Sequence, residues 1–251
     1  MQRVSGRISP WFLALVAVTV AGGVLAAAGT SRVILITGIV LLVLGGWTVS
    51  LCLHEFGHAI TAYRGGDRSV AAKGYLTLDI RRYADLGLSL LLPLVFLLLG
   101  GIPLPGGAVW IEHGAIRSRG MRSLVSLAGP LVNLVFGLLA TVAVAALPMP
   151  TALAAGLSAL ALIEVLAFVL NVLPVPGLDG FGIWEPFLSD GARAVAAKVR
   201  PWAPLALFAL IIGVPGVSSA LFAFGDTVFT AIGGDGELAS LGYSALFFWK
   251  N

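Results

Sequence analysis

Charged residues are scarce in this chain: Lys, Arg, Asp and Glu make up 11% of its 251 residues, whereas soluble domains carry about 25%. Because 59% of the residues are hydrophobic, this shortage excludes an ordinary soluble domain and indicates an integral membrane protein. The single cysteine, Cys52, excludes an internal disulfide, and we expect it to pack in the core. Internal repeats and low-complexity linkers are also lacking. We therefore expect one all-α, polytopic membrane domain over residues 1–251, with about five to six transmembrane helices.

The excess of basic over acidic residues is small, at 15 against 12. The basic residues lie in short loops beside apolar runs, which is typical of membrane topology and not of a nucleic-acid-binding face. Arg3 and Arg7 precede a first apolar run at residues 11–28. This run lacks the polar end of a signal peptide, so we expect an uncleaved first helix. By the same charge rule we place the N-terminus in the cytoplasm and the protein in the cell membrane; the sequence carries no sign of an oligomeric state.

Another apolar run, residues 86–102, has basic loops on both sides. If both loops are cytoplasmic, the segment enters the bilayer and returns without crossing it. We therefore expect a re-entrant element that continues into the Gly/Pro-rich residues 100–107 and lines a cavity. The alternative is a full span kinked at Pro93.

Later apolar runs complete the expected topology. Two crossing helices are expected at about residues 123–147 and 152–173, and the core that carries the motifs runs from about residue 33 to 186. Residues 204–232 fit either one kinked span or two short helices. Residues 238–249 end in aromatic side chains, which indicates an interfacial helix.

Histidine is scarce too, and two of the three histidines stand in the motif His54-Glu55-Phe56-Gly57-His58. Positions four apart share one face of a helix, so His54 and His58 can offer two imidazole nitrogens to one Zn²⁺, with Glu55 beside them. The motif lies about 30 Å along the helix from Val33, near the cytoplasmic end of the hydrocarbon layer. A zinc hydrolase also needs a third protein ligand and an open position for water.

Acids are rare in the apolar parts of the chain, and Asp179 is the best candidate for the third zinc ligand. It follows residues 174–177, whose prolines and glycine break the preceding helix at the membrane depth expected for the two histidines. Asn171, eight residues earlier, could donate to the oxygen of an attacked carbonyl. For Glu164 we expect a structural pairing within the bundle instead of a catalytic role.

Three motifs, in this order, resemble the signatures of the site-2 proteases, the intramembrane zinc metalloproteases. They are His54-Glu55-x-x-His58, Ala128-Gly129-Pro130-Leu131-Val132-Asn133 and Asn171-x-x-Pro174-x-Pro176-x-Leu178-Asp179-Gly180. The resemblance covers about residues 33–186, and the chain has no room for the inserted PDZ domain of larger members.

The resemblance implies a zinc ion held by His54, His58 and Asp179. It also implies Glu55 as the catalytic acid and base, Asn171 near the reacting carbonyl, and a membrane-inserted, β-like loop at residues 100–107 that pairs with the substrate. The candidate substrate-binding residues are Gly106, Gly107 and Asn133.

We therefore expect a protease that hydrolyses peptide bonds of transmembrane protein substrates near the cytoplasmic face of the lipid bilayer. One rival is a metal transporter, which would need more polar groups continuing through the bilayer than this chain has. Another is a catalytically inactive, substrate-binding relative, against which the intact Glu55 argues. We expect His113 to be an ordinary surface histidine and the arginine clusters to be topology signals.

Overall fold

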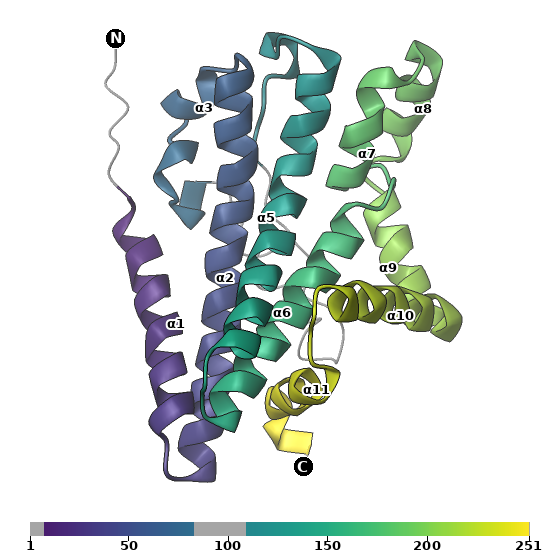
Figure 1. Cartoon of the computed structure of the whole chain (residues 1–251). Helices are drawn as coiled ribbons and strands as arrows, with labels where there is room; N and C mark the ends of the chain where they lie inside the picture. Colours follow the sequence, from purple (N-terminus) through teal and green to yellow (C-terminus); the bar gives the residue numbers. More distant parts are fainter. Residues whose placement is uncertain (1–7, 83–108, 251) are drawn as a thin grey trace.

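The computed structural model describes residues 8–82 and 109–250, and these contain helices and turns but no β-strand. The α-helices are α1 (Pro10–Ala28), α2 (Arg32–Gly65), α3 (Ser69–Ala72), α5 (Arg119–Ala146), α6 (Thr151–Asn171), α7 (Asp179–Trp184), α8 (Asp190–Val199), α9 (Ala203–Gly213), α10 (Pro215–Ala231) and α11 (Gly236–Ala245) (Figure 1). Helices α1, α2, α5 and α6 are long and apolar enough to cross a membrane, and α8 with α9, bent by 60°, would make a fifth span. The expected all-α, multi-pass architecture is confirmed for this part of the chain.

Some predictions fall on residues that the structure does not describe. The re-entrant element at residues 86–102 and the β-like loop at residues 100–107 lie outside the described residues, as do Gly106 and Gly107. All of these stay predictions.

Small residues bring α1 and α2 into direct contact. A Cβ at Gly22 would fall on the backbone of Leu42, and a Cβ at Gly38 would fall on the backbone of Ala26. In lipid, where the hydrophobic effect gives no drive for helix association, such close approach supplies the van der Waals contact that holds two helices together. The first helix is thus packed onto the helix that carries the two histidines.

Helix α6 is the centre of the bundle. Buried residues make up 78% of its apolar stretch, against 11% for α1, so α1 faces outward while α6 is enclosed by other helices. Its buried residues join those of α1, α2 and the two residues after α11 in one cluster, around Val43, Trp47 and Leu160. They join those of α5, α10 and α11 in another. A polar side chain on α6 is therefore held inside the protein and away from lipid.

The structure contains two helices within residues 204–232, where the sequence fitted either one kinked span or two short helices. Pro215 separates α9 from α10, because proline has no N–H to donate to the preceding helical turn and its ring clashes with that turn. Helix α10 runs across the direction of α5 and α6 (Figure 1). The expected interfacial helix is α11, yet it packs on α6: Gly242 lies against the Ala155 carbonyl, and Phe247 is 8% exposed. The tail is therefore part of the bundle, with Phe248 and Trp249 left about half exposed.

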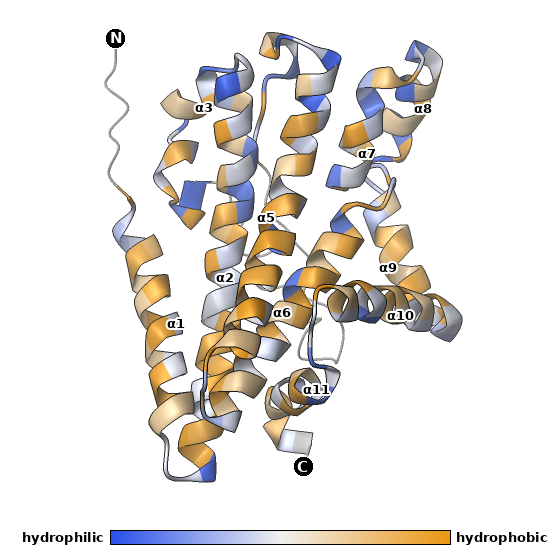
Figure 2. Cartoon of the chain, in the orientation of Figure 1, coloured by the Kyte–Doolittle hydropathy of each residue, from blue (hydrophilic) through white to orange (hydrophobic). Residues whose placement is uncertain are grey.

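Polar residues gather at the end of the bundle where α2 ends, α5 begins and α8 lies (Figure 2). This end carries Arg64, Arg117, Arg119 and Arg193, among other basic residues. The opposite end, where α2 begins and α5 ends, has Arg32 beside the turn Pro148-Met149-Pro150. The two ends therefore differ in charge as the two sides of a membrane protein commonly do.

Candidate metal centre and its cavity

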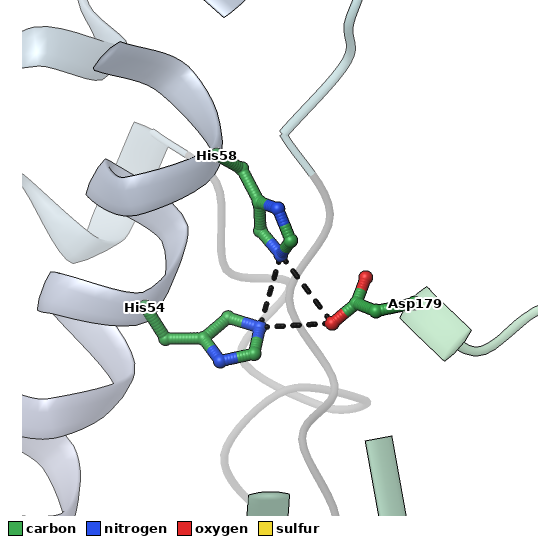
Figure 3. A group of neighbouring side chains, drawn as sticks. All are labelled: His54, His58 and Asp179. Atoms are coloured by element: carbon green, nitrogen blue, oxygen red, sulfur yellow. Dashed lines mark hydrogen bonds and ion pairs between the residues drawn. The ribbon is translucent and has the colours of Figure 1, made fainter. Parts of the chain in front are cut away.

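His54 and His58 lie one turn apart in the buried part of α2, and Asp179 is the first residue of α7. The two Nε2 atoms are 3.1 Å apart. Asp179 Oδ2 lies 3.2 Å from Nε2 of His54 and 3.4 Å from Nε2 of His58. The three side chains point toward one common position (Figure 3).

The spacing of these three atoms fits zinc. In a tetrahedral site with ligand distances of about 2.0–2.1 Å, ligand atoms lie about 3.3–3.4 Å from one another. Two unprotonated imidazole nitrogens would repel each other at 3.1 Å, unless a cation or proton lay between them. Two nitrogens and one carboxylate oxygen also leave a fourth position for water, as catalytic zinc sites do.

A break after α6 brings Asp179 to the histidines. Helix α6 ends at Asn171, because Pro174 disfavours helical backbone in the residue before it and Pro176 prevents the helix from resuming. Gly177 has φ +102°, a left-handed conformation that favours glycine. This turn reverses the chain, so that α7 starts with its carboxylate facing the motif of α2.

Hydrogen bonds behind the histidines fix which nitrogen of each ring faces the common position. His58 Nδ1 donates to the carbonyl of Val125 at 2.7 Å, and His54 Nδ1 donates to Asn133 Oδ1 at 2.6 Å. With the proton on Nδ1, each Nε2 keeps a free lone pair, as a metal-binding histidine requires. Asn133 is 5% exposed and lies behind His54, away from the cavity where the sequence placed it as a substrate-binding candidate.

A second layer holds Asn133 itself. Its Nδ2 donates to Glu164 Oε2 at 2.7 Å and to Ser50 Oγ at 3.2 Å, and the Ser50 hydroxyl donates to the same Glu164 oxygen at 2.6 Å. Because its NH₂ group is held there, Asn133 must turn its carbonyl oxygen to His54. The structural pairing expected for Glu164 is confirmed, and it joins α2, α5 and α6.

Gly129 allows α5 to approach the histidine pair. A Cβ at this position would lie 2.6 Å from His54 Nε2 and closer still to His58 Nε2, where it would block the metal position. Sequence reasoning assigned Gly129 only to helix packing. The signal was its place in the Ala128-Gly129-Pro130 motif, but nothing local to that motif indicates the facing imidazoles.

In front of the histidines lies a cavity of about 270 Å³. Glu55, 2% exposed, faces it, and its Oε2 accepts a hydrogen bond from the Val109 N–H at 3.2 Å. Asn171 lines the same cavity, and its buried Nδ2 has no hydrogen-bond partner among the described residues. The structure thus brings together Glu55, Asn171 and the three candidate zinc ligands.

The segment of residues 109–117 borders this cavity and is tied to the end of α2. Asp67, 1% exposed, accepts hydrogen bonds from the N–H groups of Ser69 and Glu112 at 2.9 and 2.8 Å. Burial favours the neutral acid, but these hydrogen bonds outweigh it and hold the pKa of Asp67 below its ordinary value. Lys73 Nζ donates to the Trp110 carbonyl at 3.0 Å. The segment is therefore anchored on both sides of Ile111.

Three further residues, Cys52, His113 and Arg200, can be compared with what the sequence predicted for them. Cys52 is fully buried, as expected. His113 is exposed, but it also lines the cavity, so it is more than an ordinary surface histidine. Arg200 lines the cavity as well; sequence reasoning assigned it to topology alone.

Fold and site together define a multi-pass membrane protein with a zinc-hydrolase type of site enclosed by its spanning helices. Comparison with known proteins agrees. "Putative zinc metalloprotease Rip2" of Mycobacterium tuberculosis is 44% identical over 253 residues, which cover 99% of this chain and 97% of that protein. The protein of the same name from Mycolicibacterium smegmatis is 42% identical over 252 residues. "Putative zinc metalloprotease YwhC" of Bacillus subtilis is 30% identical over 179 residues, 65% of this chain and 77% of that protein.

The chain belongs to the site-2 protease family, and it is a metalloprotease whose cofactor is zinc. Similarity to the mycobacterial relatives extends over nearly the whole chain, well beyond residues 33–186, where the motifs lie. No family model matches the chain, and no solved structure matches it.

Proposed function

We propose that this metalloprotease cleaves transmembrane protein substrates inside the bilayer, near its cytoplasmic face, with His54, His58 and Asp179 as zinc ligands. The observation that carries the proposal is the place of the three donors. Two lie within α2, and the third is the first residue of α7, after the short turn that follows α6; α2 and α6 are apolar enough to span a membrane. In this proposal the peptide enters the cavity from within or from the edge of the bilayer.

The distribution of charge supports the orientation. Basic residues cluster at the end of the bundle nearer the cavity, and cytoplasmic loops carry such an excess of Lys and Arg. Arg3 and Arg7 precede α1, which starts at the same end. On this basis the N-terminus is cytoplasmic, the protein lies in the cell membrane, and the whole chain forms one membrane domain.

The chemistry follows from the zinc site and from Glu55 and Asn171, which line the cavity in front of the histidines. When bound, zinc supplies a water acidic enough to attack near neutral pH and polarises the substrate carbonyl. Glu55 accepts the proton of that water and then gives it to the leaving amine. Asn171 Nδ2, which lacks a partner among the described residues, donates to the carbonyl oxygen as negative charge develops.

A substrate helix must be unwound before attack, because its carbonyls are held in internal hydrogen bonds. From the sequence we predict that the backbone of Gly106 and Gly107 pairs with the unwound stretch of the substrate. This pairing belongs to the proposal as a sequence-based prediction.

The test compares the wild type with Glu55→Gln on a panel of single-span substrates in liposomes, with zinc content measured in parallel. The proposal expects Glu55→Gln to keep zinc and to lose cleavage by about 10²–10⁴-fold. Equal cleavage by both proteins would contradict it. Zinc flux into the liposomes without proteolysis would favour a transporter instead.

A further inference from the structure

A second cavity, of about 170 Å³, opens beside the catalytic one. The two share four lining residues, His113, Gly182, Glu185 and Arg200. The second adds Arg122 from the first turn of α5 and Arg193 from α8. A peptide leaving the catalytic cavity on this side therefore passes the guanidinium groups directly.

Three arginines line the second cavity, and one of them has no acidic partner in the part of the chain that the structure describes. Arg200 donates to Glu185 at 2.8 Å, and Arg193 is paired with Asp190, an exposed acid outside the cavity. Arg122 has no carboxylate within ion-pair distance among the described residues, and its Nε is buried without an acceptor there. Leaving a buried charged donor unbonded is costly, so an arriving acceptor would be favoured.

The charge of His113 depends on the acidic and basic groups around the second cavity. Burial lowers the pKa of His113, Glu185 raises it, and the guanidinium groups of Arg122 and Arg200 lower it further. The net shift is downward, so His113 is neutral at pH 7 and the positive charge belongs to the arginines. The arginine fork matches a carboxylate with two parallel hydrogen bonds.

We propose that Arg122, with Arg193 and Arg200, binds an acidic side chain in the substrate segment that leaves the catalytic cavity. The inference rests on the proposed function and names a feature of its substrate. An extended chain advances about 3.3 Å per residue, and the two cavities share lining residues, so the acidic residue lies only a few residues from the cleaved bond. Flanks rich in Lys and Arg, the common type on the cytoplasmic side, are disfavoured at this position.

The probe is a synthetic single-span peptide with six Gln residues after the span, through which one Glu is moved position by position. Binding is measured with full-length Glu55→Gln protein, and cleavage with protein that retains Glu55. We expect Glu at one position, or at alternate positions, to bind about tenfold more tightly than the all-Gln peptide, a difference of about 1.4 kcal/mol. Arg122→Gln should remove this preference. Arg119→Gln, an exposed residue of the same helix turn that lines neither cavity, should keep it.

Three outcomes would overturn or reassign the inference. No advantage of Glu at any position overturns it, as does an advantage that survives Arg122→Gln. If Arg122→Gln instead changes activity only in vesicles containing phosphatidylglycerol, and not in pure phosphatidylcholine, the cavity binds lipid phosphate and the inference is wrong. Binding of Glu peptides that depends on Arg122, without cleavage of any peptide, supports this inference while contradicting the proposed function.

Discussion

The polar groups behind the histidine pair are hydrogen-bonded to one another, whereas those in front of it face a cavity. Behind His54, Asn133, Ser50 and Glu164 bond to one another, and among these only Glu164 Oε1 is without a partner in the described part. In front, Glu55 and Asn171 face a cavity, and the Asn171 Nδ2 has no hydrogen-bond partner among residues 8–82 and 109–250. We infer that the occupied side positions the rings and the open side receives the substrate. Substitutions on the two sides should therefore have different effects on zinc binding and on cleavage.

Asp179→Ala should have the largest effect, because it removes the donor that closes the site. Zinc binding should weaken by more than the roughly 10–100-fold that follows loss of a supporting residue. Zinc content after dialysis, measured by mass spectrometry, checks this. The control is Asp190→Ala, an exposed acid of α8; equal zinc loss in both variants would count against the assignment.

Gly129→Ala should also weaken zinc binding, because its Cβ would lie 2.6 Å from His54 Nε2. Overpacking of this kind also destabilises a protein by about 1–3 kcal/mol. Gly120→Ala, in the same helix with no heavy atom within 4 Å of the added Cβ, is the matched control. Zinc titration and thermal unfolding should separate the two; a Gly129→Ala protein with normal zinc affinity would disprove the close approach.

Asn171→Ala tests the open side. Loss of an oxyanion donor should lower kcat by about 10²–10³-fold, while zinc content stays unchanged because Asn171 is not among the three donors. Steady-state kinetics on the best substrate of the panel give the answer. An unchanged kcat would show that the free amide has no part in the reaction.

Substitution of Glu164 tests the occupied side. Glu164→Leu removes the acceptor that holds the Asn133 amide, so zinc affinity should fall about 10–100-fold. Glu164→Gln keeps an acceptor oxygen and should restore most of that affinity. If Glu164 acts only in packing, both variants will lose thermal stability without any difference in zinc affinity.

The smallest effect is expected from Asp67→Asn, which weakens the anchor of residues 109–117. Amide exchange at Glu112 should become faster at neutral pH, with little change in zinc content. The pKa of Asp67 is lowered in the folded state, so its contribution is present above the ordinary value of about 3.9 and disappears as the pH falls through the lower folded pKa. Hydrogen exchange measured by mass spectrometry should show this; unchanged exchange in the variant would contradict it.

Local patterns in the sequence predicted long apolar helices and two histidines on one helix face, and the structure agrees with both. Helix α6 was expected at residues 152–173 and spans Thr151–Asn171, because apolar length and the prolines after it determine such a helix. The four-residue spacing of His54 and His58 predicted a shared helix face, and the structure places both beside Asp179.

Contacts between distant helices could not be predicted in this way. Asn133 meets Ser50, 83 residues away, and Glu164, 31 residues away, and no periodicity within one helix indicates either contact. From the sequence, Arg122 and Arg200 indicated only which side of the membrane their loops lie on. Their place beside the catalytic cavity depends on how α5, α7 and α8 pack.

If this protein cleaves its substrates within the membrane, the position of the cut will show it. A single-span substrate is reconstituted with the protein in liposomes, and the products are identified by mass spectrometry. The account predicts a cut inside the hydrophobic span, near its cytoplasmic end, which disappears in Glu55→Gln. A cut confined to the water-exposed segment outside the span would contradict it.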